Sequence, residues 1–376
     1  MQFCVGTTIK GGEESRMKVV FVLMLLMYRS FYALQHRMGP CSIPTTYQAV
    51  SSSTSYSMTS KFTPVIMDAL IERVKENNVI DFGECEWGAH VPFVVDGITY
   101  GYLKNDFAEK IGVELSSTFQ LVRGTVSTKK ITFTKEIEGM DMEGRTNALL
   151  EACKLLRNKG KIRGWRNEML PVSTSFSAAP AFLIERAAYP IFGIKGYGVH
   201  VNGYVCKDST SRQPTHLFVA TRSKSKSTWP GMLDHIVAGA QPANISPSDN
   251  VIKECSEEAN IDESLAKQAR SIGAVSYQGS DEFGHLKRDT LFCFDLELPE
   301  SFVPTPIDGE VESFELQSID WVIDKVVQGG TKGYKPNCNL VIIDFLIRHG
   351  FVPADANRYL ELVGLMRSNG VNEFCC

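Results

Sequence analysis

The sequence predicts a helix that begins at Pro247. Ser246 is a good N-cap residue, proline suits the first helical position, and Asp249 completes a capping box. Cys255 and Ala259 share a face of this helix that can pack against a sheet. We therefore expect the helix to cover one side of a sheet.

Short segments on both sides of this helix predict that sheet. The expected elements are strands at 198–205, 217–222, 273–277, 290–296 and 318–322, a helix at 233–239 and a final helix at 339–349. Strands that flank an acidic helix and are closed by a C-terminal helix predict an α/β/α sandwich with a mixed sheet.

A smaller α+β domain is predicted before the sandwich. Its expected elements are helices at 64–77 and 142–158, a hairpin of 91–95 and 98–103 around Asp96-Gly97, and strands at 118–126 and 130–135. It shows no chemical motif, so we expect a docking or substrate-shaping role. The expected organisation is a targeting segment at 1–60, this domain at 61–185, the second domain at 186–355 and a tail at 356–376.

The composition argues against two classes of site. A net charge of −4 gives no electrostatic reason to expect a nucleic-acid partner. The ten cysteines include no C-x-x-C spacing, so we expect no structural zinc site. Their wide scatter indicates thiols in a reducing compartment rather than a disulfide framework.

Three glutamates give the predicted helix its chemistry. Glu254, Glu257 and Glu258 stand at i, i+3 and i+4, so they share one narrow face and repel one another. Mg²⁺ prefers hard oxygen ligands and is commonly shared with substrate phosphates, so the cluster suits metal-assisted attack of water on a diphosphate. Taken alone, this spacing is also typical of a solvated acidic face.

The spacing around these glutamates resembles the box of the Nudix family, G-x5-E-x7-R-E-U-x-E-E-x-G-U, where U is bulky and aliphatic. The matching positions are Gly239, Glu254, Glu257, Glu258 and Ile261. The resemblance implies a Nudix fold and hydrolysis of a diphosphate linkage.

Four positions depart from this box. Lys253 replaces an arginine, which keeps the charge but loses the two-pronged fork, and Cys255 replaces an aliphatic residue. Asn260 replaces the second glycine, a change that a left-handed helix end tolerates. Ile245 replaces the first glutamate, so we expect a weaker metal site or one ligand supplied from elsewhere.

Four longer stretches resemble a plant and fungal subfamily of Nudix proteins related to thiamine pyrophosphokinase, which carry an extra N-terminal domain. They are residues 185–205, 230–239, 287–299 and 340–350. This resemblance implies that the substrates are thiamine diphosphate and its oxidised analogues, oxothiamine and oxythiamine diphosphate. Spacing and composition themselves support only the diphosphate.

The resemblance also implies roles for the helix residues. Glu254 would be the general base or a shared metal ligand, and Glu257 and Glu258 would be the main ligands of Mg²⁺, with Mn²⁺ as the alternative. Lys253 would hold the carboxylates in place, although a simple surface ion pair would have the same sequence.

Further candidates lie outside the helix, and for each an ordinary surface or core role stays open. Phosphate contacts are expected from Arg222, Lys287 and Arg288, ring stacking from Trp229, and an additional metal ligand from Glu310 or Glu312. The expected partner is a small diphosphate. The oligomeric state stays open.

Two other functions remain alternatives. One is hydrolysis of a nucleoside diphosphate linked to another group, which would use the same chemistry in a different pocket. The other is a degenerate Nudix domain that binds its ligand without turnover, an idea motivated by Ile245. A kinase is disfavoured because the sequence contains no G-x4-G-K-[ST] phosphate loop.

The N-terminal segment has the composition of a targeting peptide. Residues 15–67 contain no Asp or Glu but several basic and many hydroxyl residues. The apolar run at 19–27 is shorter than the roughly 20 residues that span a bilayer, so we expect no stable membrane insertion. We expect the chloroplast, with the mitochondrion, the cytoplasm and the secretory pathway as alternatives.

Overall fold

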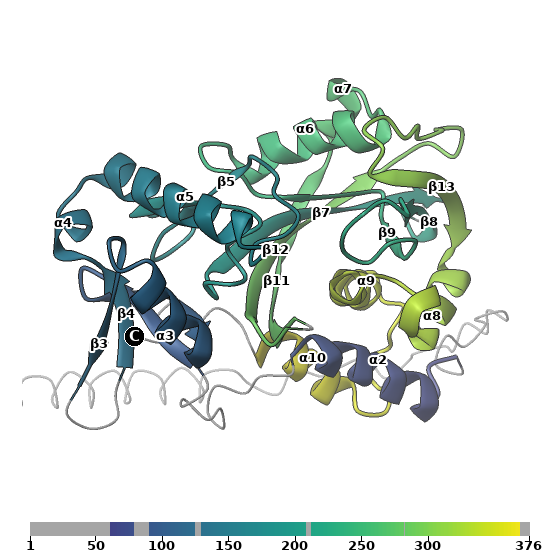
Figure 1. The fold of residues 1–376 in the computed structure, drawn as a ribbon. Helices are drawn as coiled ribbons and strands as arrows, with labels where there is room; N and C mark the ends of the chain where they lie inside the picture. Colours follow the sequence, from purple (N-terminus) through teal and green to yellow (C-terminus); the bar gives the residue numbers. More distant parts are fainter. Residues whose placement is uncertain (1–60, 79–89, 125–128, 208–211, 282, 369–376) are drawn as a thin grey trace, which may run out of the picture. The chain divides into compact units, whose positions relative to one another are not determined.

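The computed structural model describes residues 61–78, 90–124, 129–207, 212–281 and 283–368. A mixed seven-stranded sheet forms the centre of its larger α/β part (Figure 1). Its strands are β7 (Lys195–Cys206), β8 (Pro214–Arg222), β9 (Leu233–His235), β10 (Val237–Ala240), β11 (Arg270–Ser280), β12 (Leu286–Glu297) and β13 (Val311–Ser318). The main order is β11-β12-β7-β8-β13, with β10 paired to β7 and β9 paired to β8. Since β12 runs parallel to β7 and antiparallel to β11, the expected mixed sheet is confirmed.

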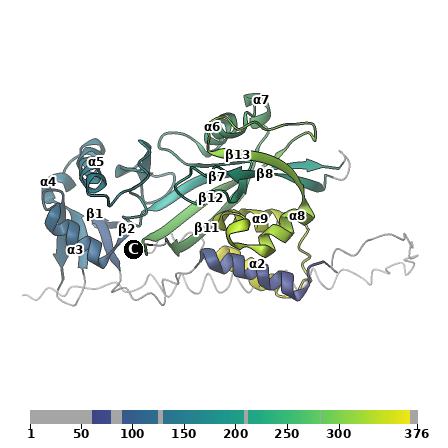
Figure 2. The ribbon, with the colours of Figure 1, turned by 45° about the vertical axis from the view of Figure 1, so that its right-hand side comes forward.

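Helices cover both faces of this sheet (Figures 1 and 2). One face carries α6 (Pro247–Ala259) and α7 (Glu263–Ala266), and the other carries α2 (Pro64–Asn77), α8 (Ile319–Gln328), α9 (Pro336–Arg348) and α10 (Tyr359–Ser368). Alternate residues of β7 serve the two layers, because Val199 and Val201 pack with Cys255 of α6 while Tyr204 packs with Phe345 of α9. The α/β/α sandwich predicted from the sequence is therefore confirmed.

Two predicted elements of the sandwich are wrong. The expected helix at 233–239 forms β9 and β10, which pair with β8 and β7. The expected strand at 318–322 is the start of α8, whose N-cap Ser318 accepts a hydrogen bond from the backbone N–H of Trp321. Pairing with distant strands overrides local spacing in the first case, and a capping residue was overlooked in the second.

A four-stranded sheet in the order β2-β1-β4-β3 forms the smaller α+β part. Its elements are β1 (His90–Val95), β2 (Ile98–Lys104), α3 (Asn105–Glu114), β3 (Phe119–Arg123), β4 (Lys129–Phe133), α4 (Lys135–Glu138) and α5 (Met142–Asn158). The predicted hairpin is confirmed, since Asp96 and Gly97 adopt φ values of 51° and 80° between β1 and β2.

A short ribbon follows this sheet in the chain. It consists of β5 (Met169–Val172) and β6 (Phe182–Glu185), which pair only with each other among the described strands. Phe182 and Ile184 of β6 are buried in the same hydrophobic cluster as Phe93 and Leu149.

Two helices cross the boundaries that the sequence suggests. α2 lies within 61–185, yet its buried Met67 and Leu70 belong to the core beneath the seven-stranded sheet. α10 lies within the expected tail, and its buried Leu362 joins the same core. The division near residue 185 stays a proposal, and the expected targeting segment at 1–60 lies outside the described residues. In the described chain no helix is both long and apolar enough to cross a membrane.

Candidate active site

Helix α6 has well-defined ends that fix the register of its carboxylates. At its start, the Ser246 hydroxyl accepts a hydrogen bond from the backbone N–H of Asp249 (3.1 Å). At its end, Asn260 adopts a left-handed conformation with φ 55° and ψ 37°, and the N–H of Ile261 donates to the carbonyl of Cys255 (3.0 Å). Asparagine thus fulfils the role that glycine has at this position of the box.

Glu258 is the most enclosed carboxylate of the helix, with 6% of the residue exposed. Its Oε2 accepts a hydrogen bond from the backbone N–H of Ala238 on β10 (3.0 Å). Burial raises the pKa of Glu258 well above its usual value, and the nearby charges of Glu254 and Asp234 act in the same direction. A cation bound beside Glu258 would stabilise the ionised form of this carboxylate.

Glu254 lies against the backbone of Gly239. A Cβ atom at position 239 would stand 2.3 Å from Cδ of Glu254, so any side chain there would displace the carboxylate. The absence of a side chain at Gly239 therefore makes room for the Glu254 carboxylate. Burial raises the pKa of Glu254, although the hydrogen bond from Lys253 opposes the shift.

Lys253 contacts both Glu254 and Glu257. Its Nζ lies 3.0 Å from Oε1 of Glu254 and 2.8 Å from Oε2 of Glu257. The Glu257 side chain is 52% exposed, compared with 13% for Glu254. These contacts fit the expected positioning role of Lys253 and a simple surface ion pair alike, and Glu257 lies at the solvent-exposed edge of the helix.

A loop before β13 brings two further carboxylates to Glu258. Oxygen atoms of Glu258, Asp308 and Glu310 all lie within 4.8 Å of one another. Gly309 between them adopts φ 79°, and the N–H of Glu310 donates to Asp308 Oδ1 (2.8 Å). Burial raises the pKa of Glu310, but the ion pair with Lys226 outweighs this effect and lowers it. A set of carboxylate oxygens fits a hard divalent cation.

Residues near the ribbon add charges that sequence reasoning missed. The Arg186 guanidinium pairs with Glu168 (2.6 Å), whose charge contributes to the raised pKa of Glu254. Arg186 and Arg166 both help to lower the pKa of Glu310. Arg166 lies outside every motif, and Arg186 lies in the 185–205 stretch that carries the resemblance, but no spacing in the sequence connected either residue to α6.

Among the predicted substrate contacts, Arg222 is already engaged. Its guanidinium donates to Asp234 Oδ2 (2.6 Å) and to the carbonyls of Thr228 (2.9 Å) and Trp229 (3.0 Å). Arg222 thus stabilises the loop before β9, and we leave it out of the proposed substrate site. Trp229 is 43% exposed and has a positive φ of 52°.

Lys287 and Arg288 lie on β12, beside aromatic rings. Lys287 Nζ stands 5.9 Å from the ring centroid of Tyr277 and 3.9 Å from Asp289, and burial lowers its pKa. Arg288 lies over the ring of Tyr102 (5.4 Å). Their contact with phosphate stays a prediction.

A second cluster of ligand-type side chains lies between β7, β9 and α9. Atoms of His200, Asp234, His235 and Cys338 lie within 4.8 Å of one another, and all four residues are buried. The Nδ1 atoms of the two histidines are 3.0 Å apart, and the Cys338 thiol donates to Asp234 (2.9 Å). Burial lowers the pKa of His235 to about 4, and the paired cations hold that of Asp234 well below its usual range despite burial.

Comparison with known proteins identifies the class. Residues 70–196 match a family model described as a domain of unknown function (DUF4743). Nudix hydrolase 20, chloroplastic, of Arabidopsis thaliana is 42% identical over 336 residues, covering 85% of this chain and 87% of the relative. Nudix hydrolase 24, chloroplastic, of the same plant is 44% identical over 282 residues, covering 75% of this chain and 73% of the relative.

These matches define a hydrolase that acts on a diphosphate bond. The carboxylate cluster offers oxygen ligands of the kind that a divalent metal ion takes. The chain belongs to the Nudix hydrolase family.

Proposed function

We propose that the chain is a Mg²⁺-dependent pyrophosphohydrolase that converts thiamine diphosphate and its oxidised analogues to the monophosphate and phosphate. The observation that carries the metal-dependent part is the convergence of Glu258, Asp308 and Glu310 within 4.8 Å. Such an all-oxygen set suits Mg²⁺, with Mn²⁺ as the alternative. When bound, the ion neutralises charge on the diphosphate and activates water.

In this proposal Glu254 and Glu258 hold the ion from α6, and the loop carboxylates of Asp308 and Glu310 complete the set. The loop would then supply the ligand that Ile245 does not. Glu257 contributes from the exposed edge, where Lys253 limits its movement. This assignment keeps the three helix glutamates in one site and adds the loop.

Glu254 is the proposed proton acceptor. A general base must lie within reach of the proton that it accepts, and Gly239 leaves room for the Glu254 carboxylate against the strand. Lys253 fixes its orientation through the 3.0 Å contact. We further propose Arg186 as a contact for substrate phosphate, because its charge reaches Glu310 and its side chain is 36% exposed.

The thiamine part rests on the sequence resemblance alone, so the test must separate substrates. We would offer the full-length protein thiamine diphosphate, oxothiamine and oxythiamine diphosphate, ADP-ribose and UDP-glucose, with and without Mg²⁺, and measure phosphate release or product formation. We expect turnover of the thiamine compounds only, dependent on Mg²⁺. Faster cleavage of ADP-ribose or UDP-glucose would overturn the substrate assignment.

Two variants make the test specific for the site. Glu254→Gln should lower kcat by about a thousandfold, within the range for loss of a general base. Glu263→Gln is the matched control, since Glu263 is an exposed glutamate on α7 that pairs with Lys267. Binding of every compound without turnover in the unmodified protein would instead favour the degenerate ligand-binding alternative.

The proposed location is the chloroplast. It is supported by the acid-poor, basic segment at 15–67 and by the chloroplastic designation of both Arabidopsis relatives. A fluorescent fusion of the full chain in plant cells should label chloroplasts, and removal of residues 1–60 should leave it in the cytoplasm. Labelling of mitochondria or the secretory pathway would refute the proposal.

A further inference from the structure

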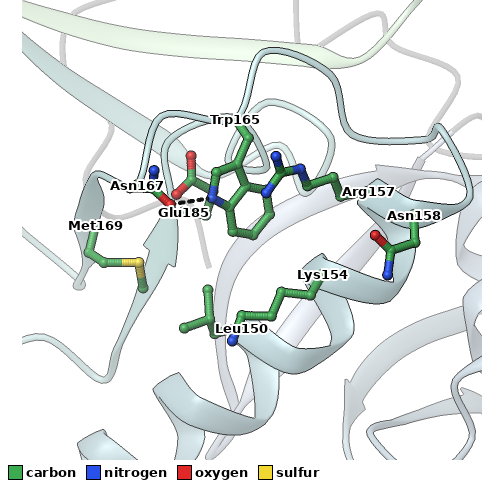
Figure 3. Close-up of a pocket in the computed structure, with 8 residues that line it drawn as sticks. All are labelled: Leu150, Lys154, Arg157, Asn158, Trp165, Asn167, Met169 and Glu185. Carbon is green, nitrogen blue, oxygen red and sulfur yellow. Dashed lines mark hydrogen bonds between the residues drawn. The ribbon is translucent and has the colours of Figure 1, made fainter.

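A pocket of about 550 Å³ lies between α5 and the β5–β6 ribbon (Figure 3). It is lined by Leu150, Lys154, Arg157, Asn158, Trp165, Asn167, Met169 and Glu185. Its volume falls within the range of small-molecule sites. Figure 3 shows the Trp165 ring pointing from its loop toward Leu150 and Lys154 of α5.

Glu185 gives this pocket a polar anchor. Only 1% of the residue is exposed, and its Oε1 accepts hydrogen bonds from the backbone N–H groups of Arg166 (2.8 Å) and Ala187 (3.3 Å). In the part of the chain that the structure describes, its buried Oε2 has no hydrogen-bond partner. An unpaired buried acceptor costs free energy, so a bound molecule that donates a hydrogen bond to this oxygen would be stabilised.

Trp165 gives the pocket an ordered aromatic surface. The Arg157 guanidinium lies 5.0 Å from the ring centroid, and the indole N–H donates to Asn167 (2.8 Å). The ring is therefore held in place before any ligand arrives, which lowers the entropic cost of stacking a planar group on it.

The pocket is separate from the carboxylate site. Met169 pairs with Glu185 across the ribbon, and both line the pocket. The pairing continues by one residue, since the N–H of Arg186 donates to the carbonyl of Glu168 (2.8 Å). Because successive residues of a strand point to opposite faces, the Glu168–Arg186 pair faces away from the pocket and interacts with the carboxylates near α6.

We propose that this pocket is a second small-molecule site that binds a planar heteroaromatic amine, with its amino N–H donating to Glu185 and its ring resting on Trp165. The neighbouring cations Lys154 and Arg157 disfavour a metal ion or a fully cationic ligand and favour a neutral ring amine. The site lies in the segment matched by the domain of unknown function and gives it a binding role independent of diphosphate hydrolysis.

The test uses adenosine, which carries one ring amine, and purine riboside, which lacks only that amine. Full-length protein labelled with ¹⁵N-tryptophan would be titrated in EDTA, so that metal chemistry at the carboxylates plays no part. We expect adenosine to shift the indole signal of Trp165, identified by its loss in Trp165→Leu, and to leave that of Trp321 unmoved. Purine riboside should bind about tenfold more weakly, as expected for loss of one buried hydrogen bond.

Variants connect this binding to Glu185. In Glu185→Gln the amide oxygen must keep the two backbone hydrogen bonds, so an NH₂ group replaces the free acceptor and adenosine binding should weaken about tenfold or more. Glu143→Gln, at an exposed glutamate of α5 that does not line the pocket, is the matched control. Since Glu185→Gln alters an internal contact, Trp165→Leu, at a half-buried ring, provides an independent loss of affinity measurable by calorimetry.

Three results would overturn the proposal. They are no shift of the Trp165 signal with adenosine, equal affinity for adenosine and purine riboside, and unchanged affinity in both Glu185→Gln and Trp165→Leu. The first would mean that Oε2 of Glu185 is met by water alone. None of these results depends on hydrolysis of a diphosphate, so they test this pocket independently of the proposed function.

Discussion

Two clusters in the described part of this molecule bring ligand-type side chains within 4.8 Å of one another. They differ in how far nearby cations balance the charge of their carboxylates. In the carboxylate cluster of Glu258, Asp308 and Glu310, Glu258 forms no ion pair among the residues that the structure describes, and its pKa is raised. In the histidine cluster of His200, Asp234, His235 and Cys338, the one carboxylate contacts Arg222 at 2.6 Å and Lys335 at 3.9 Å.

The difference shows that proximity of ligand atoms is not enough to indicate a metal site. In the histidine cluster the two histidines bond to each other, the thiol donates to Asp234, and two cations balance the carboxylate charge. Nε2 of His235 has no hydrogen-bond partner among the described residues, but the cluster carries no excess negative charge. The carboxylate cluster brings three carboxylates together, and only Glu310 has an ion-pair partner among the described residues, Lys226. A bound cation would balance the negative charge that is left. We therefore interpret the histidine cluster as part of the protein core and the carboxylate cluster as the proposed active centre.

The largest effect is expected for Glu258→Gln, which should separate activity from stability. Loss of a metal-binding carboxylate should lower kcat by about a thousandfold, equivalent to roughly 4 kcal/mol. In metal-free buffer at pH 8 the same variant should be more stable by about 1 kcal/mol, since an uncompensated buried charge is removed and the amide still accepts from Ala238. Turnover assays and urea unfolding measure the two quantities. A variant that is both inactive and less stable without metal would contradict this account.

The next largest effect is the opposite response of the histidine cluster to Asp234→Asn. This change leaves Arg222 and Lys335 without their carboxylate, so the free energy of unfolding should fall by about 3 kcal/mol. The Mg²⁺ concentration for half-maximal activity of the folded protein should stay the same. If that concentration rises strongly while stability is unaffected, the two clusters have been assigned the wrong way round.

A smaller effect is expected from the pH dependence of stability. The pKa of His235 falls from 6.5 to about 4 on folding, so the unfolded chain binds a proton first as the pH drops. The contribution of neutral His235 to the free energy of unfolding is fully present above about pH 6.5 and is lost as the pH falls toward 4. The loss between pH 7 and pH 5 should be about 2 kcal/mol. Unfolding curves at several pH values should show this loss.

A variant tests whether His235 is the source of that loss. His235→Gln, which keeps a donor toward His200, should make the pH dependence less steep. Part of it should remain, because burial also lowers the pKa of His200. His216→Gln, at a half-buried histidine outside the cluster, is the matched control. An equally steep dependence in His235→Gln would assign the loss to other groups.

How well the sequence predicts each region depends on where its determinants lie. The limits of α6 follow from Ser246, Pro247 and Asn260, which act within a few residues of the helix ends, and α2 and α5 have the predicted limits because their apolar spacing is regular. The strands β9 and β10 are set by partners in β8 and β7, which local spacing does not encode.

The same distinction applies to the candidate site. The three helix glutamates are predictable because one helix turn fixes their spacing. Asp308 and Arg186 reach the site from loops about 50 and 70 residues away, and only the folded chain brings them near Glu258 and Glu310. Arg222 has the charge of a phosphate contact, but its burial beside Asp234 is decided by tertiary packing.

The smallest effect is expected for Lys253, at the edge of the carboxylate cluster. Lys253 is 41% exposed and pairs with Glu254 and Glu257, so its stabilising contribution is small, but it positions the proposed base. Lys253→Ala should lower kcat about tenfold with little change in unfolding free energy. Lys253→Arg, the residue of the Nudix box, should retain activity or raise it, because its fork can engage both carboxylates at once. Equal losses in both variants would mean that Lys253 acts through its specific shape, and no loss in Lys253→Ala would reduce it to a surface ion pair.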